Sequence, residues 1–142
     1  MTSLLQFPKV FRQMRMRRGL MQKAVALELG LGAAALCGVE SGTRIPLDEA
    51  ALRRVADLFK LSADELAEIT WAAHHDRLIT SLSNRGASDE EVLLISESLR
   101  AWHYLKSDQR EGWLSNVKRV RESAHVVATL SSPTGGMEAQ MT

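Results

Sequence analysis

Apolar residues recur along the chain at steps of three and four, the spacing that places side chains on one face of an α-helix. Phe7, Val10, Phe11 and Met14 form the first such row, and the last includes Val127. No run of alternating β-branched residues indicates a strand. The periodicity predicts an all-α fold, with helices over about residues 8–18, 21–29, 33–40, 48–59, 63–81, 89–105 and 109–130.

Turn-forming and capping residues indicate how this helical chain is divided. Gly30 stands where a left-handed helix end is favoured, and residues 62–65 and 88–91 read as capping boxes that open two helices. The stretch 83–86, Ser-Asn-Arg-Gly, is the best boundary between them. We therefore expect a five-helix domain over residues 1–82, a two-helix extension over 87–130 and a disordered tail over 131–142.

The overall charge of +1 conceals an uneven distribution. Residues 1–27 carry six basic residues and no acidic one, whereas residues 28–142 carry 12 basic against 17 acidic residues, a net charge of −5. A basic end on an otherwise acidic protein is typical of a surface that faces phosphates. A solvated cationic helix would give the same distribution, so charge alone leaves both interpretations open.

The stretch LMQKAVALELGLGAAALCGVESGTRIP, residues 20–46, resembles the helix-turn-helix of the Cro/C1-type, or XRE, family of phage and bacterial regulators. Gln22 opens the second helix, Ala26 occupies a close-packing position and Gly30 makes the turn. The pattern Glu-x-Gly-x-Arg-x-Pro at 40–46 matches the exit from the family's recognition helix. The resemblance covers about residues 7–78 and implies a lambda-repressor-like domain of five helices, to which the C-terminal two-helix extension is added.

The resemblance also implies roles for individual side chains. Arg15 and Glu40 would form a structural ion pair between the first and third helices. Gln22 and neighbouring backbone N–H groups would hold a phosphate, and Arg44 is the best candidate for a charged contact to the DNA backbone. A free surface arginine is the alternative for Arg44. Further phosphate contacts could come from four more cations, of which not all can face the duplex: Arg12, Arg17, Arg18 and Lys23.

The predicted recognition helix lacks the polar side chains with which this family usually reads bases. Ala33 and Ala34 stand at the reading positions, Cys37 and Gly38 follow, and Gly32 leaves the helix start without a side-chain cap. Alanine offers only a methyl contact to thymine, whereas a bidentate contact discriminates by about 1–3 kcal/mol per base.

Three interpretations follow. The smooth helix could sit deep in the groove, with Thr43, Arg44, Gln22 and Lys23 supplying polar contacts and DNA shape supplying specificity. The apolar surface of Leu27, Ala33 and Ala34 could instead dock a protein. The chain could also bind DNA through the backbone alone, as a weakly specific architectural factor.

The extension carries apolar rows that need a partner surface, because a two-helix hairpin buries little by itself. We expect a homodimer on a palindromic operator, with recognition helices about 34 Å apart. Folding of both helices back onto their own chain is the alternative. The expected dimer residues are Val92, Ile95, Leu99, Trp102, Trp113, Val117 and Val120.

No nucleophile–base arrangement, phosphate-binding glycine loop or metal-ligand spacing indicates an enzyme, a metal site or a cofactor. His74 and His75 point about 100° apart on a helix and are expected to be solvated or to border the core. Cys37 is expected to be a small packing residue rather than a redox sensor, although close to DNA.

A single cysteine, no apolar run of membrane length and no secretory leader favour a cytoplasmic, nucleoid-associated protein without a membrane partner. The predicted function is sequence-specific transcriptional regulation on double-stranded DNA, with repression favoured over activation. The alternative is a degenerate helix-turn-helix that binds a protein, as an antitoxin or an antiactivator does.

Overall fold

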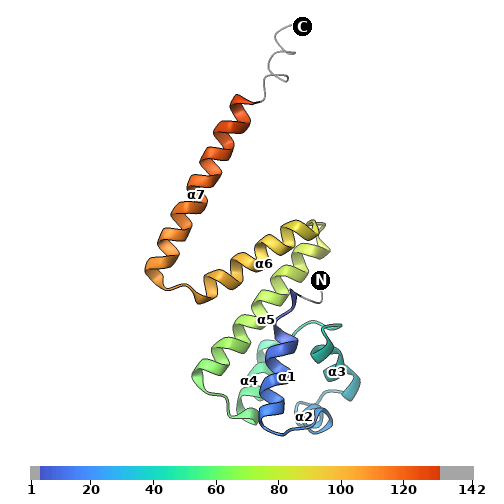
Figure 1. Ribbon diagram of the computed structural model, residues 1–142. Coiled ribbons are helices and arrows are strands. Elements are labelled where there is room, and N and C mark those ends of the chain that lie inside the picture. Colours follow the sequence, from blue (N-terminus) through green and yellow to red (C-terminus); the bar gives the residue numbers. More distant parts are fainter. Residues whose placement is uncertain (1–3, 132–142) are drawn as a thin grey trace. The chain divides into compact units, whose positions relative to one another are not determined.

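The computed structural model describes residues 4–131 and confirms the all-α expectation (Figure 1). The bounds agree with the periodicity to within about three residues, and the main difference is that the fifth helix continues to residue 84. The part of the expected tail after residue 131 lies outside the described residues. The helices are α1 (Phe7–Arg17), α2 (Gln22–Glu28), α3 (Ala33–Ser41), α4 (Glu49–Phe59), α5 (Ala63–Asn84), α6 (Asp89–Tyr104) and α7 (Ser107–Leu130).

The chain separates into two compact units, residues 1–99 and 100–142, so α6 is divided between them. This division falls later than the break expected at residues 83–86. The reason lies in α6, where Val92 and Ser96 are buried within the first unit. Val92 was expected at the dimer surface, and its burial within its own chain excludes it from that surface.

The first unit encloses a core built from the inward faces of α1 to α5. Phe11 of α1 lies between Phe7 and Phe59 of α4, with ring centroids 5.8 and 5.6 Å away. These rings pack with Leu36 of α3 and Ile69 of α5, all of which are buried. Burial of apolar surface from five helices fixes the orientation of α2 relative to α3. Two such short helices would not be stable by themselves.

Side-chain caps define where α4 and α5 begin. Asp48 Oδ1 accepts a hydrogen bond from the Ala51 N–H at 2.8 Å at the start of α4. At the start of α5 the expected capping box is present: Ser62 Oγ accepts from the Glu65 N–H at 3.2 Å, and Glu65 Oε1 accepts from the Ser62 N–H at 3.0 Å. The Ser62 backbone bond, followed by the bond from Arg18, lowers the pKa of Glu65 below its ordinary value of 4.5.

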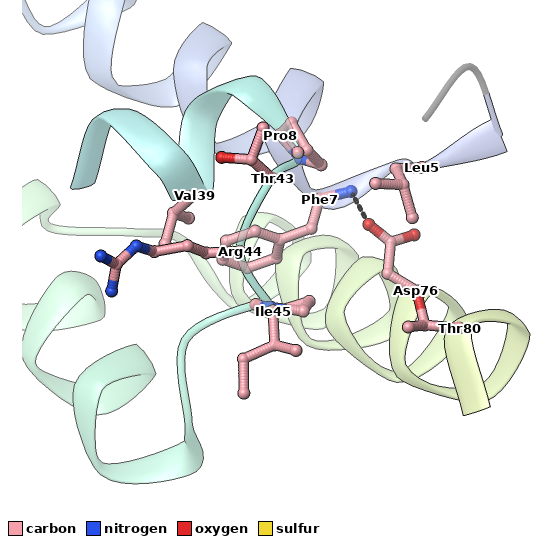
Figure 2. A pocket seen from close by; sticks show the side chains of 11 residues that line it. Leu5, Phe7, Pro8, Val39, Thr43, Arg44, Ile45, Asp76 and Thr80 are labelled. Carbon is pink, nitrogen blue, oxygen red and sulfur yellow. Dashed lines mark hydrogen bonds between the residues drawn. The ribbon is translucent and has the colours of Figure 1, made fainter. Parts of the chain in front are cut away.

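A buried polar chain joins α5 to α6 and to the start of α1. His75 Nδ1 lies 2.8 Å from Asp76 Oδ1, and His75 Nε2 lies 2.9 Å from Ser96 Oγ. Asp76 also accepts the N–H groups of Gln6 and Phe7, both at 2.8 Å, and Figure 2 draws the second bond. Asp76 therefore caps α1, because the side chain of the N-cap residue Gln6 makes no capping bond and donates instead to the Leu4 carbonyl at 2.8 Å. His75 is fully buried, so the expectation of a solvated or core-edge histidine was wrong for it.

The second unit contains the end of α6 and all of α7. Trp102 and Trp113 contact each other with ring centroids 5.9 Å apart, and the Arg110 guanidinium lies 5.2 Å from the Trp102 ring centroid. None of residues 107–130 is buried, and the apolar row of α7 is exposed at Val117 and Val120. Within residues 4–131, no single helix combines the length and the hydropathy needed to cross a membrane.

Candidate nucleic-acid interface

The turn between α2 and α3 sets the geometry of the candidate interface. The helix axes bend by 115° across residues 29–32, within the range typical of helix-turn-helix units. Gly30 has a φ of +68°, a left-handed conformation that glycine adopts without strain. The Leu31 N–H donates to the Ala26 carbonyl at 2.8 Å, and the small Ala26 side chain is buried. A tight turn and a small contact residue therefore hold α3 across α2.

An ion pair ties α3 to α1, between the two side chains that the resemblance pairs. Arg15 Nε donates to Glu40 Oε2 at 2.7 Å, and Arg15 Nη2 donates to Glu40 Oε1 at 2.9 Å. The third arginine donor reaches the Leu20 carbonyl at 2.6 Å. The Glu40 side chain is only 3% exposed and that of Arg15 12%. Arg15 and Glu40 therefore bond to each other inside the domain, and this pair fixes the orientation of α3 relative to α1.

One edge of α3 borders a basic depression, defined as the hollow between α1, α2 and α3. It brings together Gln22 and Arg12, two expected DNA contacts that are ten residues apart in sequence. Arg12 is exposed and Gln22 is half-buried. The ion pair forms part of the lining, which consists of Arg12, Arg15, Gln22, Cys37, Glu40 and Ser41.

The face of α3 next to this depression is exposed and almost without polar side chains. Ala33, Ala34 and Cys37 are exposed, and we call these three residues the open face of α3. Cys37 was expected to pack inward, and that expectation was wrong because its position on the helix points away from Leu36 and Val39. Gly32 is the N-cap of α3 and offers no side-chain bond, so the N–H groups of the first turn remain uncapped by side chains.

The other edge of α3 is formed by the exit loop, residues 42–48, which folds back on the helix. Gly42 has a φ of +82° and reverses the chain. The N–H groups of Thr43 and Arg44 then donate to the Gly38 carbonyl at 3.0 and 3.2 Å. Figure 2 shows the Arg44 side chain passing Val39, with its guanidinium extending away from the pocket behind the loop. The expected backbone contact Arg44 is thus exposed beside α3.

A groove between α3 and the start of α4 continues this second edge. Its lining includes Ala35 and Val39 of α3 together with Arg44, Arg54 and Arg77. Arg77 is occupied, since its Nη2 donates to the carbonyl groups of Pro46 and Leu47. Arg44 and Arg54 are exposed. The acidic groups of Asp48 and Glu49 also line the groove, so its lining is of mixed charge, with Arg44 as the exposed cation that follows α3.

The remaining predicted DNA contacts are of two kinds: side chains that are exposed to solvent, and one that is bonded within the chain. Lys23, Arg17 and Thr43 are exposed, and the exposed Arg17 guanidinium lies 3.9 Å from Glu65 Oε2. Arg18 is not available, and its assignment to DNA was wrong: its Nη2 pairs with Glu65 at 3.0 Å, its Nη1 donates to the Met14 carbonyl at 3.0 Å, and its Nε donates to the carbonyl of residue 59. Arg18 therefore joins the end of α1 to α4 and α5.

Sequence reasoning missed the buried polar chain and the part that Gly38 plays. His75, Asp76 and Ser96 were not assigned a joint role, because Ser96 is 21 residues from His75 and no spacing rule connects them. Gly38 was noted only as a residue that follows the reading positions, although a glycine inside a helix costs about 1 kcal/mol relative to alanine. A glycine in the middle of a helix is a usable signal, since a residue that disfavours the helix can be there for a packing reason.

Comparison with known proteins agrees with this geometry. Residues 9–69, from α1 into α5, match the family described as a helix-turn-helix domain. The match confirms the resemblance at the level of the helix-turn-helix domain and does not specify the subfamily. No curated protein and no solved structure is significantly similar to the chain. A domain of this family indicates a DNA-binding regulator.

Proposed function

Because residues 9–69 form a helix-turn-helix domain, we propose that the protein is a sequence-specific transcriptional regulator that inserts α3 into the major groove of DNA. Repression by occupation of promoter DNA is the mode that needs nothing more than this binding. The proposal places the protein in the cytoplasm, on the nucleoid.

The observation that carries the proposal is the position of cations on both edges of α3. Arg12 borders one edge beside the uncharged Gln22, and Arg44 stands at the other, with the open face between them. A helix in the major groove has a phosphate strand on each side, and contacts to both strands set the depth and register of the helix. A surface that only docks a protein has no need for cations on both edges.

Contacts to bases would then be few and mainly apolar. The methyl groups of Ala33 and Ala34 can touch thymine methyls, and Thr43 adds a hydroxyl near the end of α3. Such contacts select weakly, so sequence-dependent DNA shape would supply part of the specificity. The small side chains allow the backbone of α3 to approach the floor of the groove closely.

We also propose that the protein binds as a homodimer on a palindromic operator. The apolar row Trp113, Val117, Val120, Ala124 and Val127 alternates steps of four and three, the spacing of a coiled-coil seam. Val117 and Val120 are exposed on a helix without buried residues. Pairing of α7 with α7 of a second copy would cover this row.

The test is fluorescence anisotropy with DNA from the region upstream of the protein's own gene, at about 50 and 200 mM salt. Arg44→Ala should weaken binding to every sequence and reduce the salt slope by about one. Arg121→Ala removes the same charge from α7 and serves as the control. Exchange of thymine for uracil in the half-site should weaken binding if alanine methyls read thymine. A DNA affinity that does not change with salt concentration, or no binding to DNA, would contradict the proposal.

A second candidate function is protein binding through the same surface, as an antitoxin or antiactivator. Leu27 is 80% exposed and Met21 74%, and both belong to the α2 region next to the open face of α3. Exposed apolar side chains of this size are typical of docking sites. This function would be favoured if the unaltered chain bound a protein partner but no DNA, and if Leu27→Asp abolished binding to that partner.

A further inference from the structure

Gly38 stands in the middle of α3, where a Cβ would meet the side chain of Arg44 from the loop that follows the helix. A Cβ built on Gly38 would lie 2.7 Å from Arg44 Cγ, 2.8 Å from Arg44 Cδ and 3.1 Å from Arg44 Nε. Distances under 3.0 Å are shorter than carbon atoms tolerate, so any other residue at 38 requires Arg44 to move. The space of the missing side chain is therefore filled by the stem of Arg44.

The backbone holds Arg44 at this place independently of its side chain. The Gly38 carbonyl accepts from the N–H groups of Thr43 and Arg44, and Ser41 Oγ and Thr43 Oγ1 lie 3.2 and 3.3 Å from the same oxygen. The backbone of Arg44 is thus anchored to the residue that directly follows Cys37 of the open face. With the stem across Gly38, the guanidinium lies along the edge of α3.

We propose that Gly38 is a positioning residue, which lets Arg44 lie across α3 and supply the polar DNA contact that the helix itself lacks. This inference rests on the proposed function. The open face of α3, which consists of Ala33, Ala34 and Cys37, carries no guanidinium or side-chain amide of its own. Arg44, reached from the exit loop, delivers one to the edge of that face, and glycine is the residue that leaves room for it.

The experiment is a double-mutant cycle on the full chain with Gly38→Ala, Arg44→Ala and the pair, read by DNA affinity and salt slope. Arg44→Ala should weaken binding about tenfold, the loss expected for one charge-assisted contact. Gly38→Ala should cause a similar loss and the same decrease in salt slope, because it displaces the guanidinium. In the Arg44→Ala background, Gly38→Ala should leave affinity unchanged.

Unfolding measurements provide a second reading that does not need DNA. Alanine favours a helix more than glycine does, so Gly38→Ala should raise Tm more in the Arg44→Ala background, where the three nearest atoms are gone, than in the unaltered chain. Circular dichroism checks that every variant folds.

The outcomes separate this inference from the function on which it rests. Equal loss of affinity from Gly38→Ala in both backgrounds would show that the effect does not pass through Arg44 and would overturn the inference. Unchanged affinity in Gly38→Ala, with a loss in Arg44→Ala, would overturn it too while leaving the regulator intact. If the unaltered chain binds no DNA, the proposed function fails and the DNA role of Arg44 fails with it.

Discussion

At the scale of residues, the arginines of the first helix have different tasks that their sequence positions do not reveal. Arg15 and Arg18 are three residues apart, and both are held by carboxylates, Glu40 and Glu65. Arg12 lies one turn before and is exposed beside Gln22. An arginine that is held by a carboxylate of another helix orients its own helix, whereas an exposed one without such a bond remains available to phosphate.

The Arg15–Glu40 pair should be a major determinant of stability. Glu40→Ala leaves Arg15, whose side chain is only 12% exposed, without its partner. Breaking such a pair is expected to lower the free energy of unfolding by about 3 kcal/mol, as measured by urea denaturation. Arg53→Ala, which breaks the exposed contact to Glu49 at 3.9 Å, is the control and should cost about 0.5 kcal/mol or less. Equal losses would contradict the assignment of Glu40 to structure.

At the scale of elements, most helix ends of the domain are fixed by nearby residues, and two caps also connect helices that are far apart in sequence: Asp76 caps α1, and Glu65 binds Arg18. Gly30 and Gly42 end α2 and α3 with φ values of +68° and +82°. Glu65 closes the capping box of α5 and at the same time accepts Arg18 from the end of α1. The start of α5 is therefore both a helix cap and the point at which α1 is tied down.

The lowered pKa of Glu65 predicts how this cap responds to acid. A carboxyl whose pKa is lowered by folding stabilises the native state above its ordinary value of 4.5, and that contribution is lost as pH falls below it. Glu65→Gln should therefore be less stable than the unaltered chain at pH 7, and the difference should shrink towards about pH 3. Thermal unfolding at several pH values measures this.

Glu68→Gln is the control for the acid response, since it removes the same charge from α5 at a position that makes no capping bond. A difference between Glu65→Gln and the unaltered chain that stays constant across the pH range would contradict the cap as its source.

At the scale of the whole molecule, the proposed regulator needs the two units for different purposes. Residues 1–99 contain the segment 9–69 that matches the helix-turn-helix domain, together with the core that holds it. The second unit has few buried side chains, since residues 107–130 contain none. Its long helix with an exposed valine row is therefore suited to association with a second copy rather than to a core of its own.

The substitution Val120→Glu tests whether α7 mediates association with a second copy. A charge in the proposed seam should convert a dimer to a monomer in size-exclusion chromatography with light scattering. Affinity for a palindromic operator should then fall by about tenfold or more, because the two half-sites are no longer bound together. Val126→Glu places the same charge on α7, at a site that is 54% exposed and outside the row, and should change neither property. A monomeric unaltered chain would contradict the dimer.

What the sequence determined by itself is local. The 3.6-residue period predicts the helices, the glycines predict the left-handed turns, and the spacing of Ser62 and Glu65 predicts the cap, because each depends on residues within one or two turns. The helix-turn-helix resemblance also rests on a short segment. These features could be read without knowing which helices meet.

Only the tertiary structure decided which side chains are free to act. Arg18 is taken by Glu65, 47 residues away, and the N–H groups at the start of α1 are taken by Asp76, 70 residues from Gln6. Val92 and Ser96 are drawn into the first unit, and Arg44 lies over Gly38. Such pairings follow from how five amphipathic helices cover one core, and no spacing along the chain encodes them.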